Sequence, residues 1–316
     1  MTLHPLSFFG LSGSRDLAER VATRLEVPLA QHEERSFEDG EHKTRSQQSV
    51  RGHDVFVLHA LNGDEKESGN DKLCRLLFFC GALKDAGAQS VTAITPYLCY
   101  ARKDRRTKPN DPVITRYVAA MFEAVRVDRL IAVEVHNVTA FENAFRCPTW
   151  HIEIAPVMAA HFASLVRGEQ VVAVSPDAGG AKRADQFRQA LEKLTGSDVG
   201  SAYMEKFRSG GVVTGSVLAG DVLGRTAIII DDLISTGGTL VRAAEACRAA
   251  GATKVFAAAA HGLFVGGAQA LFESPAIDHI VVTNTVPGGI AVPAAGRLTM
   301  LDTSQAIARA VAACRD

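Results

Sequence analysis

Short apolar runs of β-forming residues alternate with helical patterns along the whole 316-residue chain. We expect strands at Asp54–Ala60, Ser90–Thr95, Arg129–Val135, Gln170–Ser175, Thr226–Ile230, Lys254–Ala260 and His279–Thr283. Between strands, apolar residues recur at the i, i+3, i+4, i+7 spacing of an amphipathic helix, as in Leu73, Leu76, Leu77 and Cys80. Strand and helix in alternation predict an α/β fold, in which mostly parallel sheets are flanked by helices.

Chain length and an internal similarity both point to two domains. A chain of this length forms about two domains of ~150 residues each. Residues 82–93 and 246–257 read alike, because each segment ends a helix at Ala-Gly-Ala and continues into a strand. Two related halves would give this pattern, although such turns are common in all α/β proteins. We place the domains at residues 1–150 and 151–316, with the last helix able to pack on the N-terminal domain.

Composition excludes several function classes. The 34 basic and 35 acidic residues give a net charge of −1, so no global positive field would hold nucleic acid or an anionic membrane. No apolar run approaches the ~18 residues of a membrane span, and the N-terminus does not resemble a signal peptide. The six cysteines contain no C-x-x-C pair, which favours reduced thiols and a cytoplasmic location.

The most informative segment follows the apolar run Ile228–Ile230. Two acids, Asp231 and Asp232, come at the carboxyl end of this predicted strand, where α/β proteins bind ligands. The next residues, up to a helix beginning at Leu240, provide hydroxyls, close backbone approach and a positive helix end for a phosphate. These phosphate-binding residues are Ser235, Thr236, Gly237, Gly238 and Thr239. The two acids would repel phosphate, so we expect them to accept hydrogen bonds from sugar hydroxyls beside it.

Two segments of the first half carry further polar side chains. Phe37, Asp39 and Glu41 lie between two short strand-like segments, where a hairpin turn at Asp39-Gly40 is the simpler interpretation. The loop after Ser90–Thr95 contains Arg102, Lys103, Asp104, Arg105 and Arg106. Four basic residues in five suit a polyphosphate, and a solvated charge run is the alternative.

A second loop of the other half joins a strand to a helix through glycines. It follows Gln170–Ser175 and contains Asp177, Gly179 and Gly180. The carboxylate of Asp177 could face a magnesium ion, and the backbone could hold another phosphate group.

Together, these residues and their spacing resemble the ribose-phosphate diphosphokinases, or PRPP synthetases, over nearly the whole chain. The segment from Asp231 to Thr239 is similar to the motif that binds phosphoribosyl pyrophosphate (PRPP) in phosphoribosyltransferase folds. The resemblance implies two phosphoribosyltransferase-type domains, the first without the PRPP loop. It also implies transfer of the β,γ-diphosphoryl group of MgATP to the anomeric hydroxyl of ribose 5-phosphate, which gives PRPP and AMP.

The resemblance assigns roles to individual residues. Phe37, Asp39 and Glu41 would reach the adenine of ATP across a subunit interface of a homo-oligomer (dimers up to a hexamer), and Arg102, Lys103 and Asp104 would flank its phosphates. His136 would bind Mg²⁺ together with Asp177, which also belongs to the ribose 5-phosphate site. Lys206 and Arg208 would begin a catalytic loop.

Two other functions share part of this pattern. A phosphoribosyltransferase has the phosphate loop but consumes PRPP, and a synthetase-associated regulatory subunit has the fold without the activity. The chain also departs from the usual family pattern: Glu134-Val135-His136 stands where Asp-Leu-His is common, Ser235 replaces an aspartate, and Pro109–Pro112 replaces a Ser-Arg segment.

Overall fold

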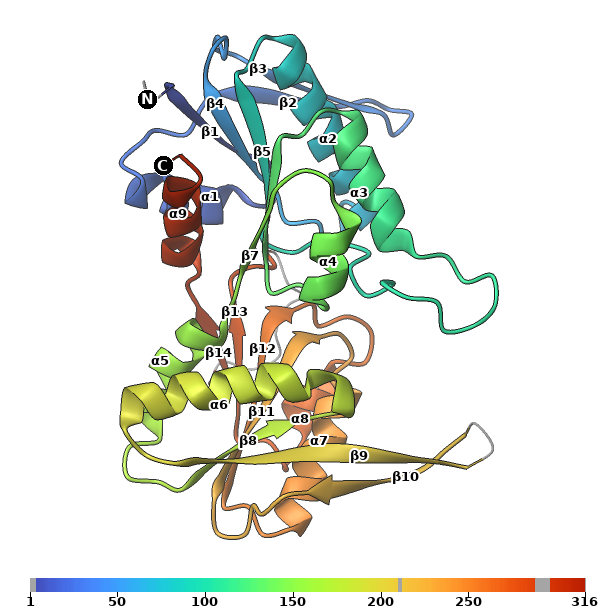
Figure 1. The fold of residues 1–316 in the computed structure, drawn as a ribbon, viewed down its shortest axis with the longest axis vertical. Coiled ribbons are helices and arrows are strands. Elements are labelled where there is room, and N and C mark those ends of the chain that lie inside the picture. The colour runs from blue at the N-terminus through green and yellow to red at the C-terminus, as the bar shows by residue number, and fades with distance from the viewer. Residues whose placement is uncertain (1–3, 210–211, 288–295, 316) are drawn as a thin grey trace. The chain divides into compact units, whose positions relative to one another are not determined.

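The computed structural model describes residues 4–209, 212–287 and 296–315, without the side chains of residues 206–216. These residues form two compact units (Figure 1). Unit 1 contains residues 4–152 and the later segments 285–287 and 303–315, and unit 2 contains residues 153–284 and 296–302.

Unit 1 is built on a parallel sheet with the strand order β1-β4-β5-β6-β7. Its strands are β1 (Leu6–Gly10), β4 (Asp54–Leu58), β5 (Ser90–Thr95), β6 (Arg129–Val133) and β7 (Thr149–Ile152). Its helices are α1 (Arg15–Arg24), α2 (Gly69–Asp85), α3 (Ile114–Ala124), α4 (Val138–Ala144) and α9 (Ser304–Ala313). Helix α2 packs on β4 and β5, whereas α1 packs on β1 and against α9 (Figure 1).

A separate two-stranded antiparallel sheet belongs to the same unit. It consists of β2 (His32–Ser36) and β3 (His42–Ser46), which pair in register as a hairpin. Strand β3 contacts α2. The hairpin therefore adds a small polar sheet to the side of the unit instead of extending the main sheet.

Unit 2 has a larger sheet with the order β10-β9-β8-β11-β12-β13-β14, parallel except for the β9–β10 pair. Its strands are β8 (Val171–Ser175), β9 (Val199–Ser209), β10 (Val212–Ala219), β11 (Thr226–Ile234), β12 (Lys254–Gly262), β13 (His279–Thr283) and β14 (Leu298–Leu301). Its helices are α5 (Ala155–Leu165), the short 3-10 helix η1 (Ala178–Gly180), α6 (Ala181–Thr195), α7 (Gly238–Ala249) and α8 (Gln269–Glu273). Helix α6 packs on α5, β8 and β9, and α7 packs on β11 and β12.

Each unit buries its own apolar core between its sheet and its helices. The predicted α/β class, with mostly parallel sheets flanked by helices, is confirmed. Cys80 and Cys247 are fully buried core residues, as their positions on apolar helix faces predict, and all six cysteines are free thiols. Within the described residues, no helix combines the length and apolar character needed to cross a membrane.

Candidate active site

The loop between β11 and α7 forms an open anion-binding turn. Ile228, Ile229 and Ile230 are buried in the middle of the sheet, and β11 continues to Ile234. Helix α7 begins at Gly238, two residues before the predicted start, and no side chain caps its N-terminus. Its first backbone N–H groups therefore have no side-chain acceptor at the cap, and the helix dipole favours an anion there.

Gly237 provides the turn with a backbone conformation that other residues rarely adopt. Its φ is +77°, in the left-handed region, and a Cβ atom at this position would lie 2.7 Å from the Cβ of Leu271 on α8. The turn is also held from the other side, because the Val265 N–H donates to the Ser235 carbonyl at 3.1 Å. The predicted phosphate loop thus has a conformation that requires glycine at position 237.

The two acids before the loop form a hydrogen-bonded pair, in which Asp232 is buried and Asp231 is half-buried. Asp231 Oδ1 accepts a hydrogen bond from the Asp232 N–H at 2.8 Å, and the Asp232 side chain is 7% exposed. Burial, reinforced by the neighbouring Asp232 carboxylate, raises the pKa of Asp231 well above its usual range. Arg183 on α6 supplies positive charge, with its Nη1 3.9 Å from Asp232 Oδ1. The pair is therefore a concentrated acceptor site beside a phosphate-binding turn.

The loop after β8 lies at the same edge of the sheet as the loop after β11. Strands β8 and β11 are parallel neighbours, paired from Val171↔Thr226 to Val174↔Ile229. Asp177 Oδ1 accepts hydrogen bonds from the N–H groups of Gly179 (3.0 Å) and Gly180 (3.1 Å). Because Arg183 follows this loop and reaches Asp232, the structure brings both predicted loops of unit 2 together.

Arg183 is a residue to which sequence reasoning assigned no role. It lies within the predicted glycine loop segment, but its pairing with Asp232 spans residues 49 positions apart in the chain. An arginine shortly after a Gly-Gly turn at a sheet's carboxyl end is the only local signal of such a pairing, and it is a weak one.

Asp232→Asn tests the acidic pair. The change keeps the size of the side chain but removes the charge that would accept sugar hydroxyls, so ribose 5-phosphate affinity should fall by about 1.5–3 kcal/mol, or one to two decades in Kd. Isothermal titration calorimetry measures the affinity directly. Asp221→Asn is the matched control, because Asp221 pairs with Arg225 in the same unit but is 67% exposed. Unchanged affinity in Asp232→Asn would contradict the assignment.

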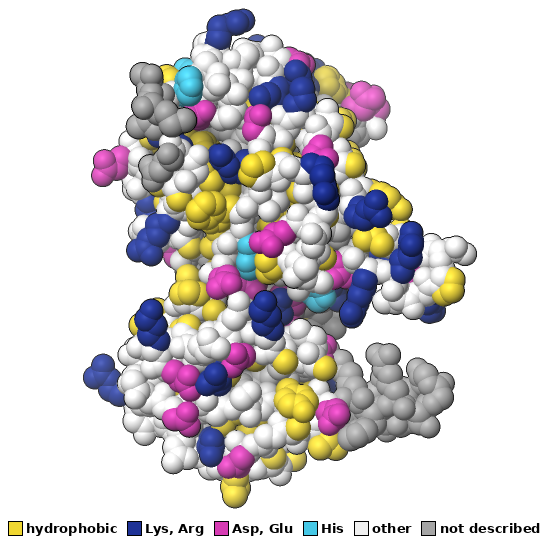
Figure 2. Space-filling view, in the orientation of Figure 1, with side chains coloured by type: hydrophobic (Ala, Val, Ile, Leu, Met, Phe, Trp, Pro, Cys, Tyr) yellow, Lys and Arg dark blue, Asp and Glu magenta, His cyan; other side chains and the backbone are white. Residues whose placement is uncertain are grey.

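The basic loop of unit 1 protrudes between β5 and α3, and Lys and Arg side chains gather on it (Figures 1 and 2). Lys103 Nζ pairs with Asp111 Oδ2 at 2.8 Å, and Asp111 also accepts hydrogen bonds from Thr107 and Lys108. The Lys103 ammonium and these hydrogen bonds hold the pKa of the Asp111 carboxyl far below its usual range. Asp111, which replaces a family residue, thus neutralises part of the loop and fixes its turn.

Asp104 connects this loop to the end of β6. Asp104 Oδ2 accepts a hydrogen bond from Asn137 Nδ2 at 2.6 Å, and Asn137 caps α4 through its Oδ1. His136, which immediately precedes Asn137, is exposed. The structure therefore places Asp104 beside Asn137, the residue that follows His136 in the chain. Arg102, by contrast, is exposed on the loop. Asn137 is a second connecting residue to which the sequence assigned no role.

The segment from Phe37 to Glu41 is the turn between β2 and β3, as the simpler interpretation predicts. Asp39 Oδ1 accepts a hydrogen bond from the Glu41 N–H at 3.1 Å, and Gly40 has a φ of +90°. Phe37 is 40% exposed, with the Arg35 guanidinium 5.0 Å from its ring centre. An exposed aromatic ring and two acids at a hairpin tip are available to a ligand, and their contact with adenine stays a prediction.

The remaining predicted residues lie on β9. Lys206 and Arg208 belong to the part of β9 that pairs only with β10, beyond the end of its pairing with β8 at Tyr203. Their side chains lie outside the described residues. Their catalytic role stays a prediction.

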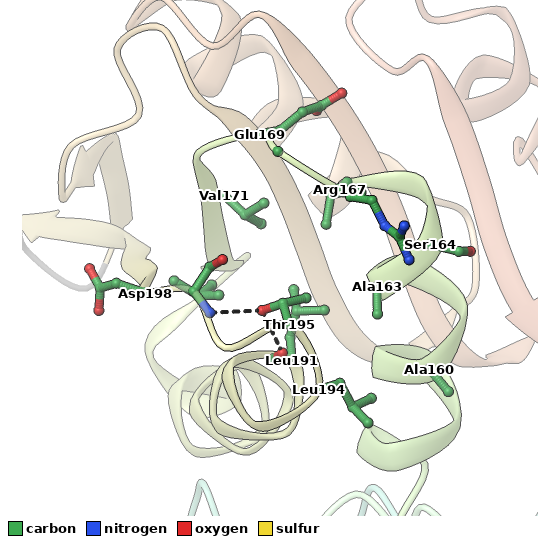
Figure 3. A pocket seen from close by; sticks show the side chains of 14 residues that line it. Ala160, Ala163, Ser164, Arg167, Glu169, Val171, Leu191, Leu194, Thr195 and Asp198 are labelled. Atoms are coloured by element: carbon green, nitrogen blue, oxygen red, sulfur yellow. Dashed lines mark hydrogen bonds between the residues drawn. The ribbon is translucent and has the colours of Figure 1, made fainter.

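None of these residues lines the pocket shown in Figure 3. It has a volume of about 490 Å³ and lies between the ends of α5 and α6, near Ala163 and Leu194. Val171 and Val199 line it at the starts of β8 and β9. It is therefore at the edge of the unit 2 sheet opposite the two glycine loops.

Known protein families account for both halves of the chain. The model described as the N-terminal domain of ribose phosphate pyrophosphokinase matches residues 6–125, and the phosphoribosyl synthetase-associated domain matches residues 213–315. The ribose-phosphate pyrophosphokinase 1 of Streptococcus agalactiae is 35% identical over 288 residues, covering 90% of this chain and 87% of that protein. This chain belongs to the ribose-phosphate pyrophosphokinase family.

Other pyrophosphokinases agree in sequence and in structure. The ribose-phosphate pyrophosphokinase 1 of Streptococcus mutans is 34% identical over 287 residues, with 90% of this chain and 87% of that protein covered. The crystal structure of phosphoribosylpyrophosphate synthetase from Mycobacterium smegmatis matches with a TM-score of 0.87 and 31% identity, covering 98% of both chains. The pyrophosphokinase fold is therefore present over almost the full length of the chain.

Proposed function

We propose that this chain is a ribose-phosphate diphosphokinase, which transfers the β,γ-diphosphoryl group of MgATP to the anomeric hydroxyl of ribose 5-phosphate. The products are PRPP and AMP. The observation that carries the proposal is the uncapped glycine turn at the N-terminus of α7, together with the acid pair Asp231 and Asp232 on the strand that leads to it. The turn suits a sugar phosphate and the acids suit its hydroxyls, and the chain belongs to a family whose members are named for this reaction.

Ribose 5-phosphate would bind at the carboxyl edge of the unit 2 sheet. The backbone N–H groups of the Gly237–Thr239 turn would hold its phosphate, and Asp231 and Asp232 would accept hydrogen bonds from its ring hydroxyls. Arg183 would keep Asp232 oriented and partly neutralised in this position. A sugar fixed at both ends presents its anomeric hydroxyl in one orientation, which is the main protein contribution to phosphoryl-type transfer.

ATP would be held by residues of unit 1. Phe37, Asp39 and Glu41 at the hairpin tip would contact the adenine, and the basic loop with Arg102, Lys103 and Asp104 would lie along the phosphates. Lys103 would have to leave its ion pair with Asp111 to bind a phosphate. Arg102 is already exposed. Lys206 and Arg208 would stabilise the charge that develops on the transferred group.

The residues present suit a magnesium ion that is bound largely by the phosphates of the substrates. The described residues contain no cluster of three His, Cys, Asp or Glu side chains able to hold a metal. Mg²⁺ usually binds one or two protein carboxylates and completes its shell with water and substrate phosphates. Asp177 and His136 are the residues we propose to orient it. When bound, the ion would neutralise the polyphosphate oxygens.

The position of an isotopic label decides between this reaction and its rivals. With ATP labelled at the γ-phosphate, the label is expected in PRPP, and the nucleotide product is expected to be AMP. Thin-layer or liquid chromatography of the products measures both. Formation of ADP, or label only in free phosphate, would rule out diphosphoryl transfer. A phosphoribosyltransferase would need a base and PRPP as substrates, and a regulatory subunit would form no AMP.

We also propose a cytoplasmic homo-oligomer. All six cysteines are free thiols, which suits a reducing compartment. Phe78 on α2 and Tyr117 on α3 are about 60% exposed (61% and 58%), and large exposed aromatic side chains are typical of interfaces. A second subunit packed on α2 and α3 would cover them.

A further inference from the structure

The hairpin of β2 and β3 is attached to unit 1 through a polar face. Along a strand, alternate residues share one face, so His32 and Glu34 of β2 lie on one side with Thr44, the partner of Glu34. Glu33 and its partner Arg45 lie on the other side and form an exposed ion pair. An isolated two-stranded hairpin is marginally stable in water, so its position depends on what its inner face contacts.

One buried carboxylate joins the inner face to two other elements. Glu34 Oε1 accepts hydrogen bonds from the Ser12 N–H at 2.7 Å, in the loop between β1 and α1, and from His32 Nε2 at 2.9 Å. Glu34 Oε2 accepts from Arg75 Nη1 of α2 at 2.8 Å, and the other terminal nitrogen of Arg75 bonds Glu67. The Glu34 and Arg75 side chains are 9% and 6% exposed. Burial alone would raise the pKa of Glu34, but the hydrogen bonds from His32, Arg75 and Ser12 outweigh it and lower this pKa to about 2.

Beyond Glu34 and its partner Thr44, the hairpin is mostly exposed. Residues 35–41 are exposed, and His42 contacts only the ring of Phe78 among the described aromatic pairs, 5.8 Å away, while Phe78 itself is 61% exposed. At the other end, His32 packs against Phe9 and Phe79 of the core. Within the described residues, the Glu34–Arg75 pair is the ion pair nearest to the tip that joins the hairpin to another element, three residues before Phe37, or ~10 Å along an extended strand.

We infer that Glu34 and Arg75 are positioning residues for the nucleotide: their buried ion pair sets the place of the hairpin tip that carries Phe37, Asp39 and Glu41. This inference rests on the proposed function, in which the tip contacts the adenine of ATP. Neither residue touches a substrate. Each acts through the hairpin, so its loss should impair ATP binding selectively and leave the ribose 5-phosphate site of unit 2 as it is.

Steady-state kinetics of Glu34 and Arg75 variants test the inference. Glu34→Ala and Arg75→Met should raise the KM for ATP by ~10-fold or more, since ~1 Å of misplacement can cost up to 100-fold in rate. The KM for ribose 5-phosphate should change less than about twofold, because its binding groups are untouched. Arg75→Lys should fall between wild type and Arg75→Met, since it keeps the charge but not both hydrogen bonds. Glu33→Ala is the matched control on the same strand, and its KM for ATP should equal that of the wild type.

Several results would overturn the inference. An unchanged KM for ATP in Glu34→Ala, an equal rise in both KM values, or the same effect in Glu33→Ala would each do so. If Glu34→Ala does not fold, as judged by circular dichroism, Glu34→Gln and Arg75→Lys provide the same comparison with smaller changes. A wild-type protein that forms no AMP would contradict the proposed function instead. Calorimetry with ATP would then still show whether Glu34 variants weaken nucleotide binding.

Discussion

Gly237→Val should weaken ribose 5-phosphate binding by ~100-fold or more, because several of the phosphate's hydrogen bonds, each worth ~1.5–3 kcal/mol, would be lost together. The φ of +77° at Gly237 is strained for any side chain and worst for a β-branched one. The new Cβ would also meet Leu271 at 2.7 Å, so the turn must move away from α8. We expect a loss of ~2–4 kcal/mol in the free energy of unfolding from strain and overpacking together. Calorimetry and urea unfolding measure the two effects.

Two other glycines separate backbone strain from loss of the site. Gly196 ends α6 with a φ of +68° and open space around it, so Gly196→Val should cost stability but leave ribose 5-phosphate affinity unchanged. Gly238 has an ordinary φ, and its nearest outside neighbour is Arg242 Nη1 at 3.5 Å. Gly238→Val should therefore fold well yet block the approach of the phosphate to the backbone. If Gly237→Val bound ribose 5-phosphate like the wild type, the turn would not be the phosphate site.

Lys206→Ala should lower kcat by ~100-fold or more, the usual loss when one preorganised electrostatic donor is removed. The KM for ribose 5-phosphate should move little, because that substrate binds at the α7 turn and Lys206 is proposed to act on the transition state. Steady-state kinetics with both substrates varied gives the two constants.

Lys254→Ala is the control for this second prediction. Lys254 also lies on a strand of unit 2, but at the amino end of β12, where it pairs with Glu169. Its replacement should leave kcat within about twofold, as expected for a surface ion pair far from the chemistry. A near-normal kcat in Lys206→Ala would refute the proposed role of this strand.

Local patterns predicted seven buried strands, because burial in a parallel sheet imposes continuous apolar runs, but did not name β1, β7, β9, β10 and β14. Ser90–Thr95 and His279–Thr283 have the predicted bounds. The prediction ended β11 at Ile230, whereas the strand continues to Ile234, since Asp231 and Ile234 keep pairing with β12. Two carboxylates interrupt the apolar run, so the sequence suggests that the strand has ended, although Asp231 and the residues after Asp232 still pair.

The phosphate turn could be predicted because its residues are contiguous. They follow one strand to the edge of the sheet, so no distant residue is needed to place them. The supporting pairs could not be predicted in this way. Arg183 with Asp232, Asn137 with Asp104, and Arg75 with Glu34 each join residues that lie 33 to 49 positions apart. Nothing in the local sequence of either partner selects the other. Such pairs depend on strand order and helix packing, which periodicity alone does not give.

After passing through unit 2, the chain returns to unit 1 and adds helix α9 to it. Helix α9 packs on α1, Ile307 and Val311 are fully buried, and Arg24 Nε bonds Ser304 Oγ at 2.6 Å. These residues are synthesised after the chain of unit 2. Domains usually fold in order from the N-terminus during synthesis. Here α1 keeps an uncovered apolar face until α9 has been made behind unit 2, and loss of α9 would damage unit 1.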